Sequence, residues 1–347
     1  MASESPTASR TLPEVLLRWG DRIEEELRRQ ALPATSQLGR MASYHLGFTD
    51  AAGMPAGGAG GKRIRPSLCL WAATACGADP ERALPVAAAI ELIHNFTLVH
   101  DDIQDRDTLR RGRPTVWSVW GEAQGINAGD GLFALALRAA LTQPQSAQVL
   151  VEATIEVIEG QCLDLQSEGR LDGSLPAYLR LVEAKTGALL GASLEAGAAV
   201  AGAAPETRER VRRAGRLLGI AFQLRDDWLG VWGDPALTGK SRDGDLERRK
   251  LGYPVVAAHA AADDGRRLEL ERLYSPSAPS GHLPREGGGS TDRIRELLEE
   301  LGGPAATARA PCERAAEAIA AIESCDFLPQ RTQEFVDVAH HVAERSR

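Results

Sequence analysis

The stretch IELIHNFTLVHDDIQD, residues 90–105, decides the fold class, because an apolar run leads directly into a cluster of acids. Its apolar residues recur at spacings of three and four, which predicts a buried helix. On such a helix Asp101 and Asp105 lie one turn apart, about 40° around the axis and about 6 Å along it, so their carboxylates point the same way. A solvated or capping helix end would be the ordinary explanation if this acid cluster stood alone.

A second pair of acids follows a second apolar helix. The stretch AFQLRDDWLG, residues 221–230, carries Asp226 and Asp227 in a setting similar to that of the first motif. Two buried helices that each end in an acid pair indicate two walls of one cavity, and such walls need cations between them. Oxygen ligands without histidine or cysteine at ligand spacing favour Mg²⁺, which usually bridges a few carboxylates and substrate phosphates. A diphosphate is the natural third partner.

The rest of the chain has the composition of an all-α protein. Aromatic residues make up only 5% of the 347 residues, and apolar residues recur at helical spacing. The Ala-rich run at residues 187–204 is apolar nearly all round, which predicts burial between helices or at a subunit interface. No strand–helix alternation with a G-x-G-x-x-G motif is present, so a dinucleotide-binding fold is excluded. We expect helices near residues 12–30, 34–46, 66–77, 81–105, 126–141, 144–168, 175–201, 205–231, 253–263, 291–301, 304–323 and 328–345.

The bulk properties narrow the function classes. The net charge is −8 and the basic residues are scattered, so nucleic acid is not an expected partner. The five cysteines are far apart and form no C-x-x-C pair, which indicates reduced thiols in a cytoplasmic protein. No segment reaches about 18 consecutive apolar residues, so we expect a soluble protein without stable membrane insertion.

The domain organisation is predicted to be simple. Residues 1–10 have no apolar segment and are expected to be disordered. Residues 11–347 are expected to form a single all-α domain. The stretch YSPSAPSGHLPREGGGS, residues 274–290, has linker composition and is predicted to be a flexible surface loop.

Basic residues cluster beside the acid motifs and beside glycines. Singly, each is more often a solvated surface charge, but their common position at helix ends favours anion binding. They are Lys62, Arg63 and Arg65 after a Gly-rich loop, Arg110 and Arg111 after the first acid motif, Lys185 in EAKTGALLG, and Lys240 in TGKSRDGD.

The ordered set of motifs resembles the trans-isoprenyl diphosphate synthases, the polyprenyl synthetase family. The resemblance implies the isoprenoid synthase fold, with long antiparallel helices around a deep central cavity, and a homodimer. The matching motifs are GGKRIRP (60–66), IELIHNFTLVHDDIQD (90–105), RRGRPT (110–115), GQCLDL (160–165), KTGAL (185–189), FQLRDDWLG (222–230) and GDPALTGK (233–240).

The resemblance also implies residue roles. Asp101, Asp105 and Asp226 would hold three Mg²⁺ ions against an allylic diphosphate, and together with Lys185 and Lys240 they form the expected catalytic set. A lone histidine between apolar residues, such as His94, is more often a core residue, yet its place on the motif helix favours a ligand role. The implied allylic-diphosphate ligands are Arg110, Lys185, Thr186, Gln223, Lys240 and Lys250, and those for isopentenyl diphosphate are Lys62, Arg65, His94 and Arg111.

The implied reaction is a head-to-tail condensation. Diphosphate departure ionises the allylic substrate to a carbocation in a dry pocket, the double bond of isopentenyl diphosphate attacks it, and a proton is lost. In the family, the released pyrophosphate is thought to accept that proton. Phe96 and Thr97, one turn before the acid motif, are expected to form the floor of the product cavity. We therefore predict a C20 product, geranylgeranyl diphosphate, followed by C15 farnesyl diphosphate.

Several positions depart from the family pattern. Gly230 stands where the second motif usually has its third acid, and the next carboxylate in the sequence is Asp234. Ser241, Arg242, Leu251 and Gly252 are also unusual, which leaves Lys250 as the candidate cation there. Two alternatives stay open: a class I terpene cyclase, which needs no isopentenyl diphosphate, and a non-catalytic subunit of a synthase.

Overall fold

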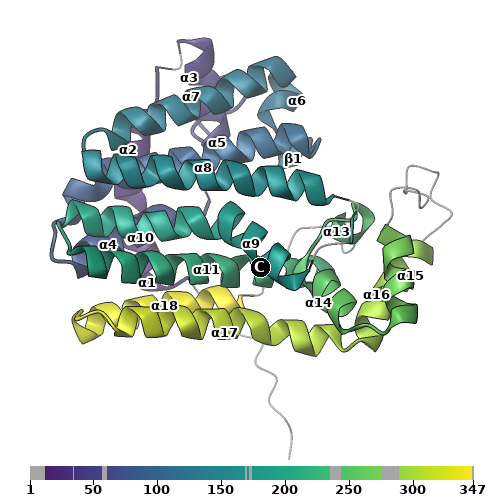
Figure 1. Ribbon diagram of the computed structural model, residues 1–347. Coiled ribbons are helices and arrows are strands. Elements are labelled where there is room, and N and C mark those ends of the chain that lie inside the picture. Colours follow the sequence, from purple (N-terminus) through teal and green to yellow (C-terminus); the bar gives the residue numbers. More distant parts are fainter. Residues whose placement is uncertain are drawn as a thin grey trace, which may run out of the picture.

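The computed structural model confirms the all-α prediction. Long helices run side by side in layers, and a group of shorter helices lies at one end of the molecule (Figure 1). Residues 1–10 and most of the predicted surface loop lie outside the part of the chain that the structure describes. The described residues are 12–33, 35–56, 61–168, 170–171, 174–234, 244–274 and 289–345.

The first half of the chain contains the helix with the first acid motif. This helix, α5 (Leu84–Gln104), packs against α4 and α7. Its neighbours in the sequence are α1 (Glu14–Leu17), α2 (Gly20–Gln30), α3 (Gln37–His45), α4 (Ile64–Ala75), the 3₁₀ turn η1 (Pro80–Ala83), the hairpin of β1 (Leu109–Arg110) and β2 (Arg113–Pro114), α6 (Val116–Trp120), α7 (Glu122–Ala140) and α8 (Pro144–Ser167).

The second half contains the helix with the second acid motif. This helix, α11 (Pro205–Trp232), packs between α10 and α17, and α17 and α18 cover the lower edge of the bundle in Figure 1. The elements are α9 (Leu175–Val182), the π-helical turn η2 (Glu183–Gly187), α10 (Ala188–Val200), α11, α13 (Gly244–Glu247), α14 (Tyr253–Ala261), α15 (Asp264–Tyr274), α16 (Gly289–Glu300), α17 (Gly303–Glu323) and α18 (Pro329–Glu344).

Helix α5 is the central helix of the core. By length and composition alone, the segment Pro80–Gln104 could cross a membrane, but 72% of its apolar window is buried inside the protein. Residues such as Ile90, Leu92 and Ile93 are almost fully buried against neighbouring helices. Apolar burial of this extent is the main force that holds such a bundle together. The apolar run of the first motif is therefore a core segment.

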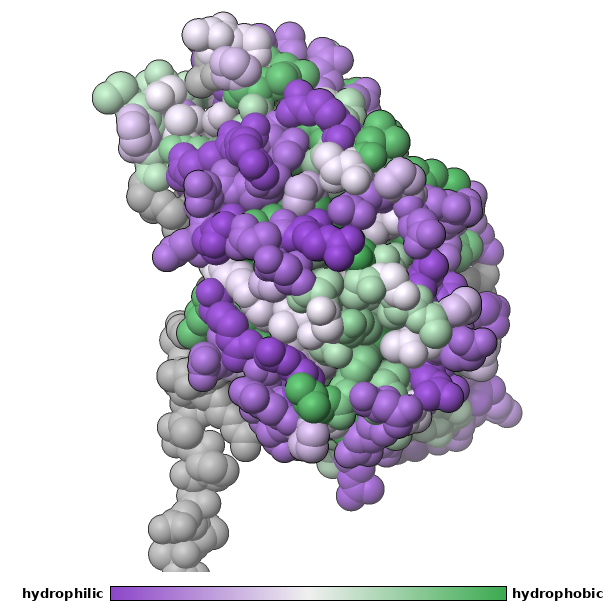
Figure 2. All heavy atoms as spheres, turned by 90° about the vertical axis from the view of Figure 1, so that its left-hand side faces the viewer, coloured by the Kyte–Doolittle hydropathy of each residue, from purple (hydrophilic) through white to green (hydrophobic). Residues whose placement is uncertain are grey.

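The surface differs from this core. Viewed from the left-hand end of Figure 1, the molecule shows charged and polar residues over most of its face, with smaller apolar areas between them (Figure 2). The contrast matches the amphipathic spacing of helices such as α2, whose Ile23 and Leu27 are fully buried.

The structure differs from the predicted helices mainly at short elements. The helix expected over 175–201 is interrupted by η2, and the expected helix 12–30 is divided into α1 and α2. The hairpin, α6 and α13 were not predicted, because one or two turns carry too little periodicity to be read. Helix α15 has 11 residues and was also not predicted. Tyr274 ends α15 and is fully buried, so the predicted loop 274–290 begins one residue too early.

Candidate active site

The first acid motif lies at the C-terminal end of α5. The backbone N–H of Asp105 donates to the carbonyl of Asp101 at 2.8 Å, so the two residues occupy successive turns as predicted. Burial raises the pKa of Asp101, and the nearby Asp105 carboxylate raises it further, while Lys185 lowers it. The Nζ atom of Lys250 lies 2.7 Å from Oδ2 of Asp105. Two carboxylates predicted to belong to the site, Asp101 and Asp105, thus lie close to two lysines predicted to belong to it.

Lys185 reaches these acids from the π-helical turn η2, a geometry often found at functional sites. It forms an ion pair with Asp164 of α8. Burial alone would lower the pKa of Lys185, but the carboxylates of Asp164, Asp101 and Asp105 outweigh it, so the pKa is raised. Sequence reasoning missed Asp164 as a site residue, although its motif GQCLDL belongs to the set that carries the resemblance.

A glycine of the same motif allows η2 to approach α8. An ideal Cβ on Gly160 would lie only 2.7 Å from the Cα atom of Lys185. Real side chains do not tolerate such a distance, so any larger residue would push η2 and its lysine away from α8. The close approach brings the Lys185 ammonium into reach of the α8 and α5 carboxylates.

The second acid motif lies on α11, the second wall of the predicted cavity, and its two aspartates have different surroundings. Asp226 is about one-third exposed, and its Oδ1 lies 3.2 Å from a guanidinium nitrogen of Arg345. Arg345 also stacks on the Phe222 ring, with its Cζ atom 3.7 Å from the ring centroid. Sequence reasoning missed Arg345, because only the fold brings the C-terminal segment to this wall.

Asp227 is held by three hydrogen bonds. Its Oδ2 accepts from the hydroxyl of Tyr178 and from the backbone N–H of Tyr253 at 2.8 Å, and its Oδ1 accepts from Nε2 of Gln223 at 2.8 Å. Gln223 in turn accepts from the hydroxyl of Thr186 at 3.1 Å. Burial raises the pKa of Asp227 to about 6. The carboxylate of Asp227 thus accepts hydrogen bonds from three protein donors. Asp226 is the more exposed of the two aspartates and is the better candidate for a metal ligand.

A second cluster, of cations, lies further toward the N-terminus of α5. A guanidinium nitrogen of Arg65 lies 3.5 Å from Nε2 of His94. Burial lowers the pKa of His94 well below its usual value, and the charges of Arg65, Arg111 and Arg110 lower it further. Arg111 also lies against Gly61, the residue before Lys62. The predicted residues for the second substrate are therefore neighbours, with His94 neutral among cations.

The hairpin that carries Arg110 and Arg111 is tied to α5. Nε of Arg110 lies 2.6 Å from Oδ1 of Asp102, a buried carboxylate at the centre of the first motif. Burial raises the pKa of Asp102 to about 6, while Arg110 lowers it. Asp102 thus positions a predicted ligand, whereas Asp101 and Asp105 on either side of it lie near the lysines.

His45 belongs to the same surroundings, and no sequence motif predicts this. Its Nε2 is buried and has no hydrogen-bond partner within the described residues. Burial lowers the pKa of His45 to about 3, and Arg111, Arg110 and Arg113 lower it further. It lines a hollow of about 20 Å³ together with Tyr44, Asp102, Arg110, Arg111, Arg113, Pro114 and Thr115.

The predicted floor residues lie on α5 between the two clusters. Phe96 is only 7% exposed, and its ring centroid lies 5.3 Å from that of Phe133 on α7 and 5.1 Å from that of His100. Thr97 is half-buried and donates its hydroxyl to the carbonyl of His94 at 2.8 Å. The aromatic contacts of Phe96 make it suited to block an apolar chain.

The donor set fits a hard cation that an anionic ligand helps to hold. Among the described residues, no three histidine, cysteine or acidic side chains converge into a ready-made metal cage. The available donors are carboxylate oxygens, and the usual Mg²⁺ site takes only one or two of them and completes its shell with phosphates and water. Lys240, the remaining predicted cation, lies outside the described residues.

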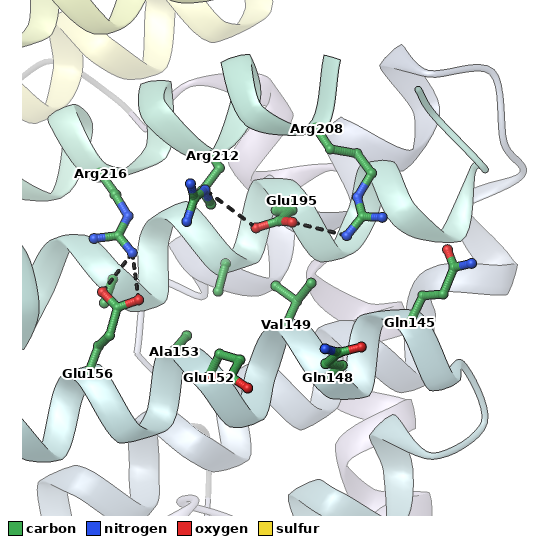
Figure 3. A pocket seen from close by; sticks show the side chains of 12 residues that line it. Gln145, Gln148, Val149, Glu152, Ala153, Glu156, Glu195, Arg208, Arg212 and Arg216 are labelled. Carbon is green, nitrogen blue, oxygen red and sulfur yellow. Dashed lines mark hydrogen bonds and ion pairs between the residues drawn. The ribbon is translucent and has the colours of Figure 1, made fainter. Parts of the chain in front are cut away.

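The surface also has a hollow of about 430 Å³ between α8, α10 and α11 (Figure 3). Its charges pair with one another: Arg216 binds Glu156 at 2.6 Å, and Arg208 binds Glu195 at 3.0 Å. None of the predicted site residues lines it. We therefore place the candidate site at the acid and cation clusters of α5, η2 and α11.

The fold and these clusters together define an all-α protein with paired acids and buried cations, a combination suited to anionic ligands. Comparisons with known proteins agree. The model of the polyprenyl synthetase family matches residues 54–282. A (2E,6E)-farnesyl diphosphate synthase of Mycobacterium bovis is 40% identical over 350 residues, covering 97% of this chain and 94% of the relative.

Two further comparisons extend this result. A geranylgeranyl diphosphate synthase of Mycobacterium tuberculosis is 43% identical over 293 residues, covering 82% of this chain and 81% of the relative. The crystal structure of a polyprenyl synthetase from Streptomyces coelicolor A3(2) superposes with a TM-score of 0.88 at 37% identity, covering 95% of this chain and 98% of that one. The chain therefore belongs to the polyprenyl synthetase family and is a prenyltransferase.

Proposed function

We propose that the protein condenses isopentenyl diphosphate with an allylic prenyl diphosphate in a Mg²⁺-dependent reaction. The observation that carries this proposal is the presence of two separate clusters of charged residues beside one helix, α5. One combines Asp101 and Asp105 with lysines, and the other combines Arg65 and Arg111 with His94. A reaction that joins two diphosphate esters needs two such places.

The acid cluster is the proposed allylic site. When bound, up to three Mg²⁺ ions held by Asp101, Asp105 and Asp226 would neutralise the departing diphosphate. Lys185, kept charged by its carboxylate neighbours, would stabilise the same leaving group. Thr186 and Gln223, which are hydrogen-bonded to each other, would orient it. Lys250 and Lys240 complete the proposed set.

The cation cluster is the proposed site for isopentenyl diphosphate. Arg65, Arg111 and Lys62 would hold its diphosphate, with Arg110 shared at the boundary between the two sites. His94 is neutral and can donate one ring N–H without adding charge. Holding both substrates in this arrangement would direct the double bond toward the allylic carbon, which is the entropic part of the catalysis. The buried surroundings would exclude water from the carbocation.

We infer C20 as the main product and C15 as the next. Phe96 supports a short-chain limit, because its bulky ring is buried and packed against Phe133. The relatives named above include makers of both lengths. A terpene cyclase would have no use for the Arg65 cluster, and a non-catalytic subunit would have no use for the paired acids.

We further propose a cytoplasmic homodimer. Helix α8 exposes Val151, Ile155 and Ile158 at helical spacing, and Ile126 of the adjacent helix α7 is 48% exposed. An apolar stripe of this kind across two neighbouring helices suits the same stripe of a second copy. The remaining surface is well supplied with charge, and we expect neither nucleic acid nor a membrane as a partner.

Steady-state kinetics with both substrates varied would test the assignment. Arg65→Ala should raise KM for isopentenyl diphosphate by about 10-fold or more, the effect of losing about 1.5–3 kcal/mol of a charged hydrogen bond. Lys185→Ala should act mainly on the allylic substrate and on kcat. Gln333→Ala, at an exposed position on α18, is the control. Equal effects of the Arg65 and Lys185 variants on both substrates would contradict two separate sites.

A further inference from the structure

The two acid walls differ at one position. On α5, carboxylates stand at positions i and i+4, Asp101 and Asp105, whereas on α11 the same spacing gives Asp226 and Gly230. Asp227 cannot make up the difference, because three protein donors occupy its carboxylate. Apart from Asp227, α11 therefore has one carboxylate at these two positions, Asp226, where α5 has two.

A residue from outside α11 occupies the open position. An ideal Cβ on Gly230 would lie well inside 3.0 Å of Oδ2 of Asp245, with the Cγ of that residue at 3.4 Å and its Cβ at 3.9 Å. Since these distances shorten from the Cβ to the Oδ2 of Asp245, its carboxylate points at the position that a Cβ atom of residue 230 would take. It lies where a side chain at position 230 would begin, and only glycine leaves that space open.

The short helix α13 and the residues after it connect both walls. Arg248 lies 2.9 Å from Asp107, just beyond the first motif, and Lys250 lies 2.7 Å from Asp105. Asp245 stands at the start of the same segment. Its side chain is 31% exposed, and within the described residues its one ion-pair partner is Arg248 at 3.4 Å. A loose, half-exposed pair of this kind contributes little and can be exchanged for a stronger cation.

We propose that Asp245 supplies the second carboxylate of the α11 wall and that Gly230 is present to admit it. The proposal rests on the function proposed above and extends it. Asp245 and Asp226 together hold the cation on the α11 side of the diphosphate, Asp245 either directly or through a bound water. The acid missing from the second motif is thus provided by a residue 15 positions later, and Asp234, the next carboxylate in the sequence, has no part in it.

Metal binding can be measured without turnover. The purified protein is titrated with Mg²⁺ at a fixed concentration of inorganic pyrophosphate, and the midpoint of thermal unfolding is recorded at each step. Asp245→Asn should raise the half-saturating Mg²⁺ concentration by about 10-fold or more, the usual effect of losing a supporting carboxylate at a metal site. Glu247→Gln, an exposed acid on the same helix, and Asp234→Asn should leave it unchanged.

A rescue variant separates a metal role from a purely structural one. Asp245→Ala should weaken Mg²⁺ as Asp245→Asn does. Gly230→Asp in that background should recover the affinity to within about threefold of the wild type, a difference of about 0.7 kcal/mol. The Cβ of residue 245 lies 3.9 Å from the new side chain, so space is available. Gly230→Ala alone should displace the Asp245 carboxylate and weaken Mg²⁺.

The outcomes distinguish this inference from the proposed function. An unchanged Mg²⁺ midpoint for Asp245→Asn, or a shifted one for Asp234→Asn alone, would overturn the role of Asp245 while the wild type still elongates its substrate. Failure of Gly230→Asp to rescue Asp245→Ala would also overturn it. A wild type that neither responds to Mg²⁺ with pyrophosphate nor elongates an allylic substrate would overturn both.

Discussion

Asp226 and Asp227 are adjacent and chemically identical, yet the structure predicts opposite consequences for their replacement by asparagine. In Asp226→Asn, the amide oxygen can still accept from Arg345, so the free energy of unfolding should change by no more than about 1 kcal/mol. The loss of a metal-binding charge should instead lower kcat by about 10²–10³-fold, the range seen when one electrostatic contact to a transition state is removed.

Asp227→Asn should act first on stability. The side-chain oxygen of the new asparagine can still accept from Tyr178 and Tyr253, but its NH₂ group then faces the NH₂ group of Gln223. The side-chain oxygen of Gln223 already accepts from Thr186. One buried donor left without an acceptor costs about 1–3 kcal/mol. Asp227→Ala leaves three donors unpaired and should cost about 3–5 kcal/mol, a decrease in melting temperature of roughly 6–10 °C.

Two measurements on the same samples check this contrast. Thermal and urea unfolding give the stability of each variant, and initial rates at saturating substrates and 10 °C below each melting temperature give its activity. Gln333→Ala, a surface change on α18, serves as the control. The reasoning is refuted if Asp226→Asn loses as much stability as Asp227→Asn, or if Asp227→Asn loses more activity than Asp226→Asn at equal folded fraction.

Three further outcomes follow from the packing and charges. Phe96→Ala should lengthen the main product by at least one C5 unit in radiolabelled product analysis. Phe335→Ala, at another buried position, should leave product length unchanged, although both variants lose about 3–5 kcal/mol of stability. Burial raises the pKa of Asp227 from 3.8 to about 6, so the folded state favours the protonated carboxyl. Its contribution to the free energy of unfolding is therefore complete below pH 3.8 and is lost as the pH rises through 6. Urea unfolding between pH 3.5 and 7.5 should show this loss in the wild type relative to Asp227→Asn, and a constant difference would contradict it. Ile155→Asp should convert the dimer to a monomer in analytical ultracentrifugation, and an unchanged dimer would place the interface elsewhere.

Helical periodicity was sufficient to predict the long elements. The runs around Ile90 and Leu224 have apolar residues at spacings of three and four, and both are buried helices in the structure. Periodicity could not predict η2 or α13. A π-helical turn has no sequence signature of its own, and a helix of four residues depends on its neighbours rather than on its own propensity.

The sequence predicts site residues that lie within motifs, but it has no signal for residues that only the fold brings beside them. Asp101 and Asp226 were found because each follows an apolar run at a helix end. Arg345 stands in a segment without a motif, and Asp245 ends the stretch TGKSRDGD, in which only Lys240 was predicted to be a site residue. Their contacts with Asp226 and Gly230 depend on how α18 and α13 fold back onto α11. Such proximity between distant segments has no local trace in a single sequence.

We propose that this protein joins isopentenyl diphosphate to an allylic diphosphate. The most direct measurement incubates the purified protein with Mg²⁺, farnesyl diphosphate and radiolabelled isopentenyl diphosphate, and then with farnesyl or geranylgeranyl diphosphate alone. We predict labelled geranylgeranyl diphosphate, one pyrophosphate released per condensation, and no product from either allylic substrate by itself. Hydrocarbon formed from a single substrate, or no conversion of the pair, would contradict the account.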